Sequence, residues 1–325
     1  MRHLDIRGLG PVSRIGLGTW QFGTKEWAYG EDYAEHTADQ IVRRARELGV
    51  NLFDTAELYG FGRSERILGR ALGPERDQVV VASKLFPVAP VPPMVRRRGR
   101  ASARRLQLER IPLYQIHQAH PLAPDSVTMR GMRDLLREGR IGAVGVSNYS
   151  LARWRRADSA LGRPVVSNQV EFSLAHAGPL RDLVPFAERE ERVVIAYSPL
   201  AQGLLGGRYD ASHRPVGIRA HNPLFRAENL TRATLLLDLL REVAAAHDAR
   251  PAQVALAWLL AQPRVVVIPG ASSVEQLELN VAAAGLELAD DERAALTAAA
   301  RTFTPVSAAS IALGNARKRL RSRLP

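Results

Sequence analysis

The chain of 325 residues is 46% hydrophobic and 24% charged, as in a soluble enzyme with a large core, and it has no cysteine. Disulfides, thiolate metal sites and cysteine nucleophiles are therefore excluded, and redox chemistry needs a bound cofactor. The net charge of +12 is concentrated in two clusters, residues 96–105 and 317–323, which lack the interleaved aromatic side chains that stack on single-stranded nucleic acid.

We interpret the basic clusters as solvated surface and expect no nucleic-acid partner. The sequence has no run of about 18 apolar residues and no apolar signal-peptide core at its N-terminus. We therefore expect a cytoplasmic protein that does not contact a membrane.

Apolar periodicity predicts the elements in chain order. Residues 3–13 alternate around Gly8 and Gly10, which predicts a hairpin, and residues 24–35 are expected to form a loop. Strands are expected at 14–18, 50–53, 79–82, 113–117, 141–146, 165–170, 193–197 and 265–268. Helices are expected at 37–48, 64–72, around 96–105, and at 127–138, 151–161, 180–190, 231–247, 251–262, 274–284 and 290–301, and a long loop at 198–229.

This alternation predicts an α/β fold, a (β/α)8 TIM barrel. The N-terminal hairpin would plug the N-terminal mouth of the barrel, and extra helices would follow at the C-terminal end. A length of 325 residues is compatible with two domains, but single barrels with insertions also reach it, and we predict one domain over residues 1–325. Its basic tail would begin at about residue 305.

Three of the predicted strands end in ionisable side chains. The stretch F-D-T-A-E-L-Y places Asp54 at the end of one strand and Tyr59 five residues later, whereas Lys84 and His117 follow the next two apolar runs. The carboxyl ends of parallel barrel strands converge on one face, where such enzymes keep their chemistry. A phenol with a pKa of about 10 is a poor proton donor at neutral pH unless a cation lowers that value, and Lys84 is the candidate cation.

These four residues resemble the catalytic tetrad of the aldo-keto reductase superfamily. Five further motifs resemble that superfamily in order and spacing: G-L-G-T-W from residue 16, G-V-S-N-Y from 145, N-Q-V-E-F from 168, Y-S-P-L-A-Q-G-L-L-G-G from 197 and I-P-G-A-S-S-V-E-Q-L-E-L-N from 268. Together they cover roughly residues 14–300. The resemblance implies NADPH-dependent reduction of an aldehyde or ketone by hydride transfer, with Tyr59 as general acid, His117 orienting the carbonyl, and no metal.

The resemblance also implies a nicotinamide site at the ends of later strands, with a strap across the pyrophosphate and an adenosine phosphate at the start of the helix at 274–284. A G-x-G-x-x-G fingerprint after a strand is absent, which argues against the other common nicotinamide fold. The predicted cofactor residues are Gly18, Thr19, Trp20, Asp54, Ser147, Asn148, Gln169, Tyr197, Ser198, Pro199, Leu200, Gln202, Gly203, Leu204, Arg208, Gly270, Ser272, Ser273, Gln276 and Asn280.

The choice between NADP(H) and NAD(H) depends on the 2′-phosphate. Many superfamily members carry an arginine in the segment where this chain has Ser272, Ser273 and Gln276. We predict NADP(H), because serine and glutamine variants also occur in the superfamily and Arg208, Arg214 or Arg219 of the strap could supply charge. NAD(H) remains the alternative.

The predicted substrate pocket consists of Trp20, Tyr59, Phe86 and His117, with the aromatic residues of 24–35 and the tail as further walls. An alternative function is also open, because Y-S-P-L-A-Q-G-L and G-A-S-S-V-E-Q-L resemble the potassium-channel β-subunit branch. In that case the barrel would bind a nicotinamide nucleotide as a redox-sensing subunit with little or no turnover. The sequence specifies neither the natural substrate nor the oligomeric state.

Overall fold

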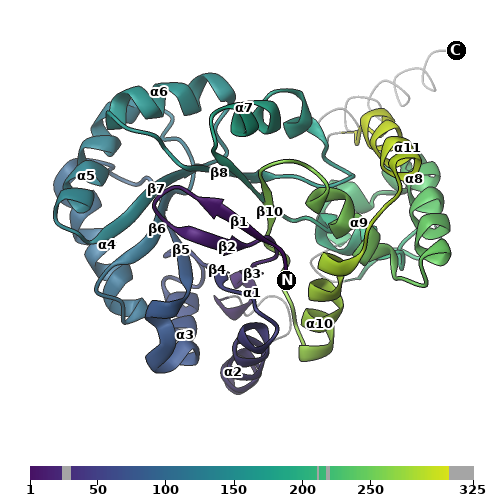
Figure 1. Ribbon diagram of the computed structural model, residues 1–325, viewed down its shortest axis with the longest axis horizontal. Coiled ribbons are helices and arrows are strands. Elements are labelled where there is room, and N and C mark those ends of the chain that lie inside the picture. The colour runs from purple at the N-terminus through teal and green to yellow at the C-terminus, as the bar shows by residue number, and fades with distance from the viewer. Residues whose placement is uncertain (24–30, 211, 217–219, 307–325) are drawn as a thin grey trace, which may run out of the picture.

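The computed structural model describes residues 1–23, 31–210, 212–216 and 220–306, with the side chains of 31–34 left out. Its central feature is one sheet of eight parallel strands that pair in chain order, as Figure 1 shows. The strands are β3 (Leu17–Gly18), β4 (Leu52–Asp54), β5 (Val80–Leu85), β6 (Ile111–Ile116), β7 (Ile141–Ser147), β8 (Ser167–Glu171), β9 (Val193–Tyr197) and β10 (Val265–Val267).

The sheet closes on itself between β3 and β10, the strands at its two ends. Parallel bridges join Ile15 to Val267 and Gly18 to Gly270, and the Gly16 N–H donates to the Val267 carbonyl over 2.8 Å. A Cβ at Gly18 would lie 2.8 Å from the Ile268 carbonyl oxygen, so the close approach at this seam requires a glycine. The predicted (β/α)8 barrel is confirmed.

Helices follow the strands and surround the barrel (Figure 1). They are α1 (Trp20–Gly23), α2 (Glu31–Glu47), α3 (Arg63–Leu72), α4 (Pro92–Leu106), α5 (Asp125–Arg137), α6 (Leu151–Leu161), α7 (Leu183–Arg189), α8 (Ala227–Ala246), α9 (Pro251–Leu260), α10 (Val274–Ala282) and α11 (Asp290–Thr302). Short 3₁₀ helices are η2 (Gly73–Gln78), η3 (Gly178–Arg181), η4 (Ala201–Gly206), η6 (Pro223–Phe225) and η7 (Ala283–Gly285).

The apolar core has two layers, because strand side chains alternate between the faces of the sheet. The larger layer lies between the sheet and the helices, and the smaller one fills the barrel. Ile6 and Val12 belong to the inner layer and come from the hairpin of β1 (His3–Ile6) and β2 (Gly10–Ser13). The predicted hairpin is confirmed, and its apolar side chains join the inner core.

Several predicted boundaries were wrong. Helix α2 already begins at Glu31, within the expected loop, because its first turns E-D-Y-A-E-H lack the apolar spacing that revealed the rest. No helix was predicted at residues 20–23, where the structure has the short helix α1 with Trp20. The expected loop at 198–229 contains η4 and η6. The described part leaves out residues 24–30 and the tail from 307. Of the three aromatic residues in the expected loop at 24–35, it therefore leaves out Trp27 and Tyr29 entirely and Tyr33 in its side chain.

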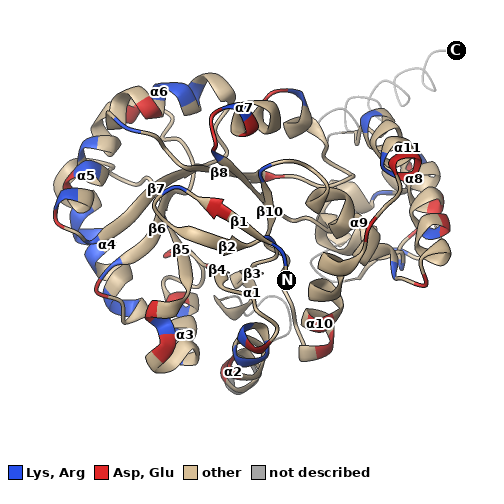
Figure 2. Cartoon of the chain, viewed as in Figure 1, with Lys and Arg blue, Asp and Glu red and all other residues tan. Residues whose placement is uncertain are grey.

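Most arginines of the first basic cluster, which lies on α4, are close to acidic side chains. The pairs are Arg96 with Asp134 at 2.5 Å, Arg98 with Glu57, Arg100 with Glu138 at 2.8 Å, and Arg105 with Glu65 at 2.6 Å. Figure 2 shows this mixture of charges along α3, α4 and α5. These contacts support a structural role for the cluster. Within the described ranges, no helix is both long and apolar enough to cross a membrane.

Candidate active site

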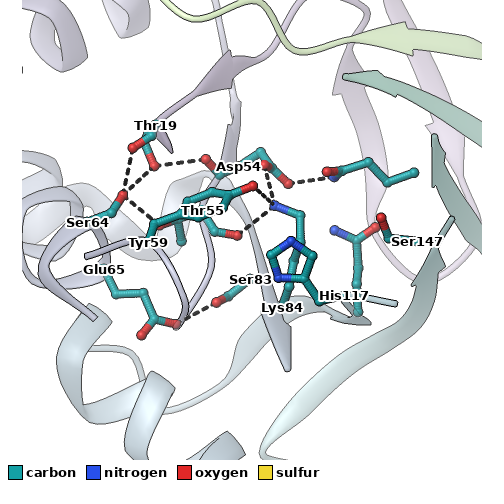
Figure 3. A network of polar contacts seen from close by, with 12 residues as sticks. Thr19, Asp54, Thr55, Tyr59, Ser64, Glu65, Ser83, Lys84, His117 and Ser147 are labelled. Carbon is teal, nitrogen blue, oxygen red and sulfur yellow. Dashed lines mark hydrogen bonds and ion pairs between the residues drawn. The ribbon is translucent and has the colours of Figure 1, made fainter. Parts of the chain in front are cut away.

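The four predicted catalytic residues gather at the carboxyl end of the barrel. Asp54 is the last residue of β4, His117 directly follows β6, and Tyr59 lies between β4 and α3. Lys84 is inside β5 rather than after it, because the strand continues through polar residues that are buried. Figure 3 shows the side chains from these three strands facing one another.

Lys84 is the centre of the group. Its Nζ donates to Asp54 Oδ1 over 2.5 Å, to the Thr55 carbonyl over 2.9 Å and to the Tyr59 hydroxyl over 3.0 Å. These three acceptors match the three donors of an ammonium group. Lys84 is only 1% exposed, so protein groups rather than water stabilise the charge of its ammonium. The ammonium therefore links the Asp54 carboxylate to the phenol.

Burial and the neighbouring charges together set the pKa values of Lys84, Tyr59 and Asp54. Burial acts to lower the pKa of Lys84, but Asp54 and Tyr59 outweigh it and the net pKa is raised, so the ammonium keeps its charge. Burial raises the pKa of Tyr59, and Lys84 only partly offsets it. The expectation that Lys84 would bring the phenol below its ordinary value was therefore wrong for the net shift, because desolvation of a phenolate is the larger effect. Burial also raises the pKa of Asp54, against its bonds to Lys84 and Gln169.

His117 is a neutral side chain near pH 7. Burial, and secondarily the Lys84 charge, lower its pKa to about 3. Its ring packs edge-on between Tyr59, with centroids 5.8 Å apart, and Phe86, at 6.0 Å. Of the predicted pocket residues, Trp20 lies on α1 and is 43% exposed. A neutral imidazole at this position can donate a hydrogen bond but is not an acid at neutral pH.

A buried hydroxyl network supports the site from behind, and sequence reasoning did not find it. Ser64 Oγ lies 2.8 Å from Thr19 Oγ1 and 2.9 Å from Thr55 Oγ1, and it donates to the Thr19 carbonyl. Thr19 Oγ1 also donates to the Asp54 carbonyl over 2.9 Å (Figure 3). Thr19 therefore has its hydroxyl inside the protein, although it was predicted to contact the cofactor. The signal that was overlooked is the small polar Ser64 after the glycine-rich turn at 60–62.

The predicted nicotinamide residues form a second connected group on the next strands. Asn148 receives a hydrogen bond from the Tyr197 hydroxyl at 3.0 Å and donates to Ser147 Oγ at 3.1 Å and to the His117 carbonyl at 3.3 Å. Gln169 Nε2 donates to Asp54 Oδ2 over 2.7 Å, which joins this group to the tetrad. Asn148 is exposed and Tyr197 half-buried at the same rim as Tyr59. An amide beside an aromatic ring fits a flat carboxamide-bearing ligand.

The predicted strap begins in left-handed backbone, with φ of 49° at Ser198, 56° at Gln202 and 98° at Gly203. Leu204 is fully buried, so its side chain anchors the strap to the core instead of facing a ligand. The strap residues Pro199 and Leu200 are buried and half-buried, and Gln202 is exposed. Arg208 is exposed, Arg214 Nε donates to the Phe225 carbonyl over 3.2 Å, and Arg219 lies outside the described residues.

The predicted adenosine-phosphate residues meet at the start of α10. Ser273 caps this helix by accepting from the Gln276 N–H over 3.1 Å, and Ser272 donates through N and Oγ to Gln276 Oε1. Asn280 Nδ2 donates to the Gly270 carbonyl at 3.2 Å, which ties the helix to the preceding turn. The helix start provides N–H groups and a positive dipole end for an anion. The acidic side chain in its first turn is Glu275.

A parallel barrel with ionisable side chains grouped at the carboxyl ends of its strands is the architecture of a TIM-barrel enzyme. Comparison with known proteins gives the family. The model of the aldo/keto reductase family matches residues 14–301. The chain therefore belongs to the aldo/keto reductase family, and it is an NAD(P)H-dependent oxidoreductase.

Three similar proteins illustrate the range of relatives. An uncharacterised oxidoreductase of Mycobacterium tuberculosis is 69% identical over 94% of this chain and 95% of its own. A protein of Escherichia coli named NADH-specific methylglyoxal reductase is 32% identical, over 86% of this chain and 92% of its own. The crystal structure of an aldo/keto reductase from Klebsiella pneumoniae in complex with NADP and acetate is 29% identical, with a TM-score of 0.74, and covers 94% of this chain and 96% of that one.

Proposed function

We propose that this protein reduces an aldehyde or ketone to the alcohol with NADPH, and that Tyr59 is the general acid. The observation that carries the proposal is the Lys84 ammonium, held between Asp54 and the Tyr59 hydroxyl at 2.5 and 3.0 Å beside a neutral His117. The bound cofactor supplies the hydride to the carbonyl carbon.

The protein residues move and hold the proton. Tyr59 keeps its proton at neutral pH, since its pKa is raised, and donates it to the carbonyl oxygen as negative charge develops there. Lys84 stabilises the phenolate that Tyr59 becomes, and Asp54 keeps Lys84 in place. His117 donates a hydrogen bond that orients the carbonyl oxygen. Trp20 and Phe86 form apolar walls of the substrate pocket.

Turnover tests this proposal. We expect a loss of reduced-cofactor absorbance with members of a panel of aldehydes, quinones and keto sugars. Tight cofactor binding without turnover on any of them would instead support a redox-sensing subunit, the function suggested by the resemblance to the potassium-channel β-subunit branch.

For the cofactor, we expect NADPH to bind more tightly than NADH in a fluorescence titration. The NADP complex of the Klebsiella pneumoniae relative and the serine-capped start of α10 support this choice, whereas the Escherichia coli relative is named NADH-specific. We place Ser272, Ser273 and Gln276 around the 2′-phosphate, with exposed Arg208 as the strap cation. Equal or tighter binding of NADH would contradict this placement, and Arg208→Met should weaken NADPH binding selectively.

A further inference from the structure

Glu57, which lies between Asp54 and Tyr59 in the chain, connects the site to helix α4. Its Oε1 accepts the Phe86 N–H over 2.5 Å, and Arg98 of α4 binds both carboxylate oxygens, with Nε 3.0 Å from Oε2. Arg98 Nη1 also donates to the Val88 carbonyl over 2.9 Å. The Glu57 side chain is 11% exposed and that of Arg98 22%. Together they clamp the loop at 86–91 between β5 and α4.

The clamped loop has little regular structure of its own. Its backbone bonds within the loop run from the Val88 N–H to the Phe86 carbonyl and from the Val91 N–H to the Ala89 carbonyl, and Ala89 has a φ of 46°. Such short bonds fix local turns but do not attach the loop to the barrel. The Glu57 and Arg98 side chains supply that attachment at its first and third residues.

Phe86, the first residue of the loop, contacts His117. The two rings are 6.0 Å apart at an interplanar angle of 85°. A functional histidine is usually oriented by a hydrogen bond to its second ring nitrogen. Among the described residues, however, His117 Nδ1 is buried and has no hydrogen-bond partner. Packing against Phe86 and Tyr59 must therefore hold the ring.

We propose that the Glu57–Arg98 ion pair is a positioning device that sets the orientation of His117 through Phe86. The role of His117 as hydrogen-bond donor to the carbonyl rests on the function proposed above, whereas the positioning of its ring does not. Without the ion pair, the loop that carries Phe86 is no longer held in place. The imidazole of His117 then samples several orientations, and it holds the carbonyl oxygen of the substrate poorly. Neither Glu57 nor Arg98 needs to touch the substrate.

The same helix offers a matched control. Arg100 pairs with Glu138 at 2.8 Å through side chains that are 50% and 32% exposed, and that pair joins α4 to the end of α5 rather than to the loop. Arg98→Met and Arg100→Met therefore remove the same group from one helix, but only the first releases the loop. Glu57→Gln is a gentler variant, because the amide oxygen still accepts the Phe86 N–H.

The first readout is the ¹⁵N NMR signal of the His117 ring in the cofactor-free protein, identified by its loss in His117→Gln. We expect Arg98→Met and Glu57→Gln to shift or broaden this signal and Arg100→Met to leave it unchanged. The second readout is kinetic. We expect kcat/KM to fall by about 10- to 100-fold in Arg98→Met, as for misplacement of a catalytic group, with unchanged cofactor affinity. Arg98→Lys, which keeps one charge, should recover part of the loss.

An unchanged His117 signal in both Arg98→Met and Glu57→Gln would overturn the proposal, as would equal kcat/KM in Arg98→Met and Arg100→Met. Glu57→Gln keeps the test valid if Arg98→Met does not fold. A wild-type protein without carbonyl turnover would contradict the proposed function, but the NMR comparison would still decide whether the ion pair positions His117.

Discussion

Replacing Tyr59 by Phe is expected to lower the rate of hydride transfer by about 10²–10⁴-fold, the range that general acid catalysis contributes. The change removes the proton donor but keeps the ring that packs against His117 at 5.8 Å. We expect cofactor affinity to stay the same, since the proposed nicotinamide contacts come from other strands. Single-turnover absorbance and fluorescence titration measure the two quantities separately.

Tyr114→Phe is the control for Tyr59→Phe. Tyr114 is a fully buried tyrosine of β6 whose ring belongs to the layer between the sheet and the helices. Loss of its hydroxyl should leave hydride transfer unchanged. Near-normal rates in Tyr59→Phe would refute the assignment of the acid. His117 could not replace Tyr59 at neutral pH, because its pKa of about 3 leaves it without the proton.

Replacing Lys84 by Met is expected to suppress turnover and to destabilise the protein. The variant leaves Asp54 buried, at 2% exposure, without its cation, which typically costs about 3–5 kcal/mol in the free energy of unfolding. Denaturant unfolding measures this loss. The double variant Lys84→Met/Asp54→Asn removes the unpaired charge, so we expect much of the stability to return while turnover stays low.

The pH profile separates the catalytic effect of Lys84 from its structural one. The acid form of Tyr59 is the active one, so reduction falls as pH rises through the phenol pKa. Burial raises that pKa and Lys84 opposes the rise, so loss of Lys84 raises it further. The basic limb of kcat/KM in folded Lys84→Met protein should therefore move to higher pH. A limb that moves to lower pH would show that Lys84 does not stabilise the phenolate.

Local patterns along the sequence were enough to predict the fold. Strand β9 has the predicted bounds, Val193–Tyr197, because it is a largely apolar run. Helix α6 has the predicted bounds, Leu151–Leu161, because Ser150 caps its start by accepting the Arg153 N–H and Gly162, with a φ of 73°, ends it. Glycine with positive φ ended α2, as Gly49 with a φ of 80° shows. The start of α2 was missed because its first turns carry no apolar stripe.

The chemistry of the site depended on contacts between distant segments. The sequence placed Asp54, Lys84 and His117 at strand ends, with Tyr59 just beyond the first of them. Only the folded barrel, by removing water, decided that the pKa of Tyr59 is raised and that of His117 is lowered. Desolvation depends on every neighbouring atom and leaves no local pattern in the chain.

The Glu57–Arg98 pair was invisible in the sequence for a related reason. It joins residues 41 positions apart. Arg98 also belongs to a run of arginines that we interpreted from the sequence as solvated surface. The barrel seam at Gly18 and Gly270 likewise joins segments about 250 residues apart in the printed numbering. By itself the sequence determined the order of the barrel strands and of most helices, and which side chains stand at the strand ends. Tertiary structure alone decided which of them meet and how strongly they are shielded from water, because both depend on packing between elements.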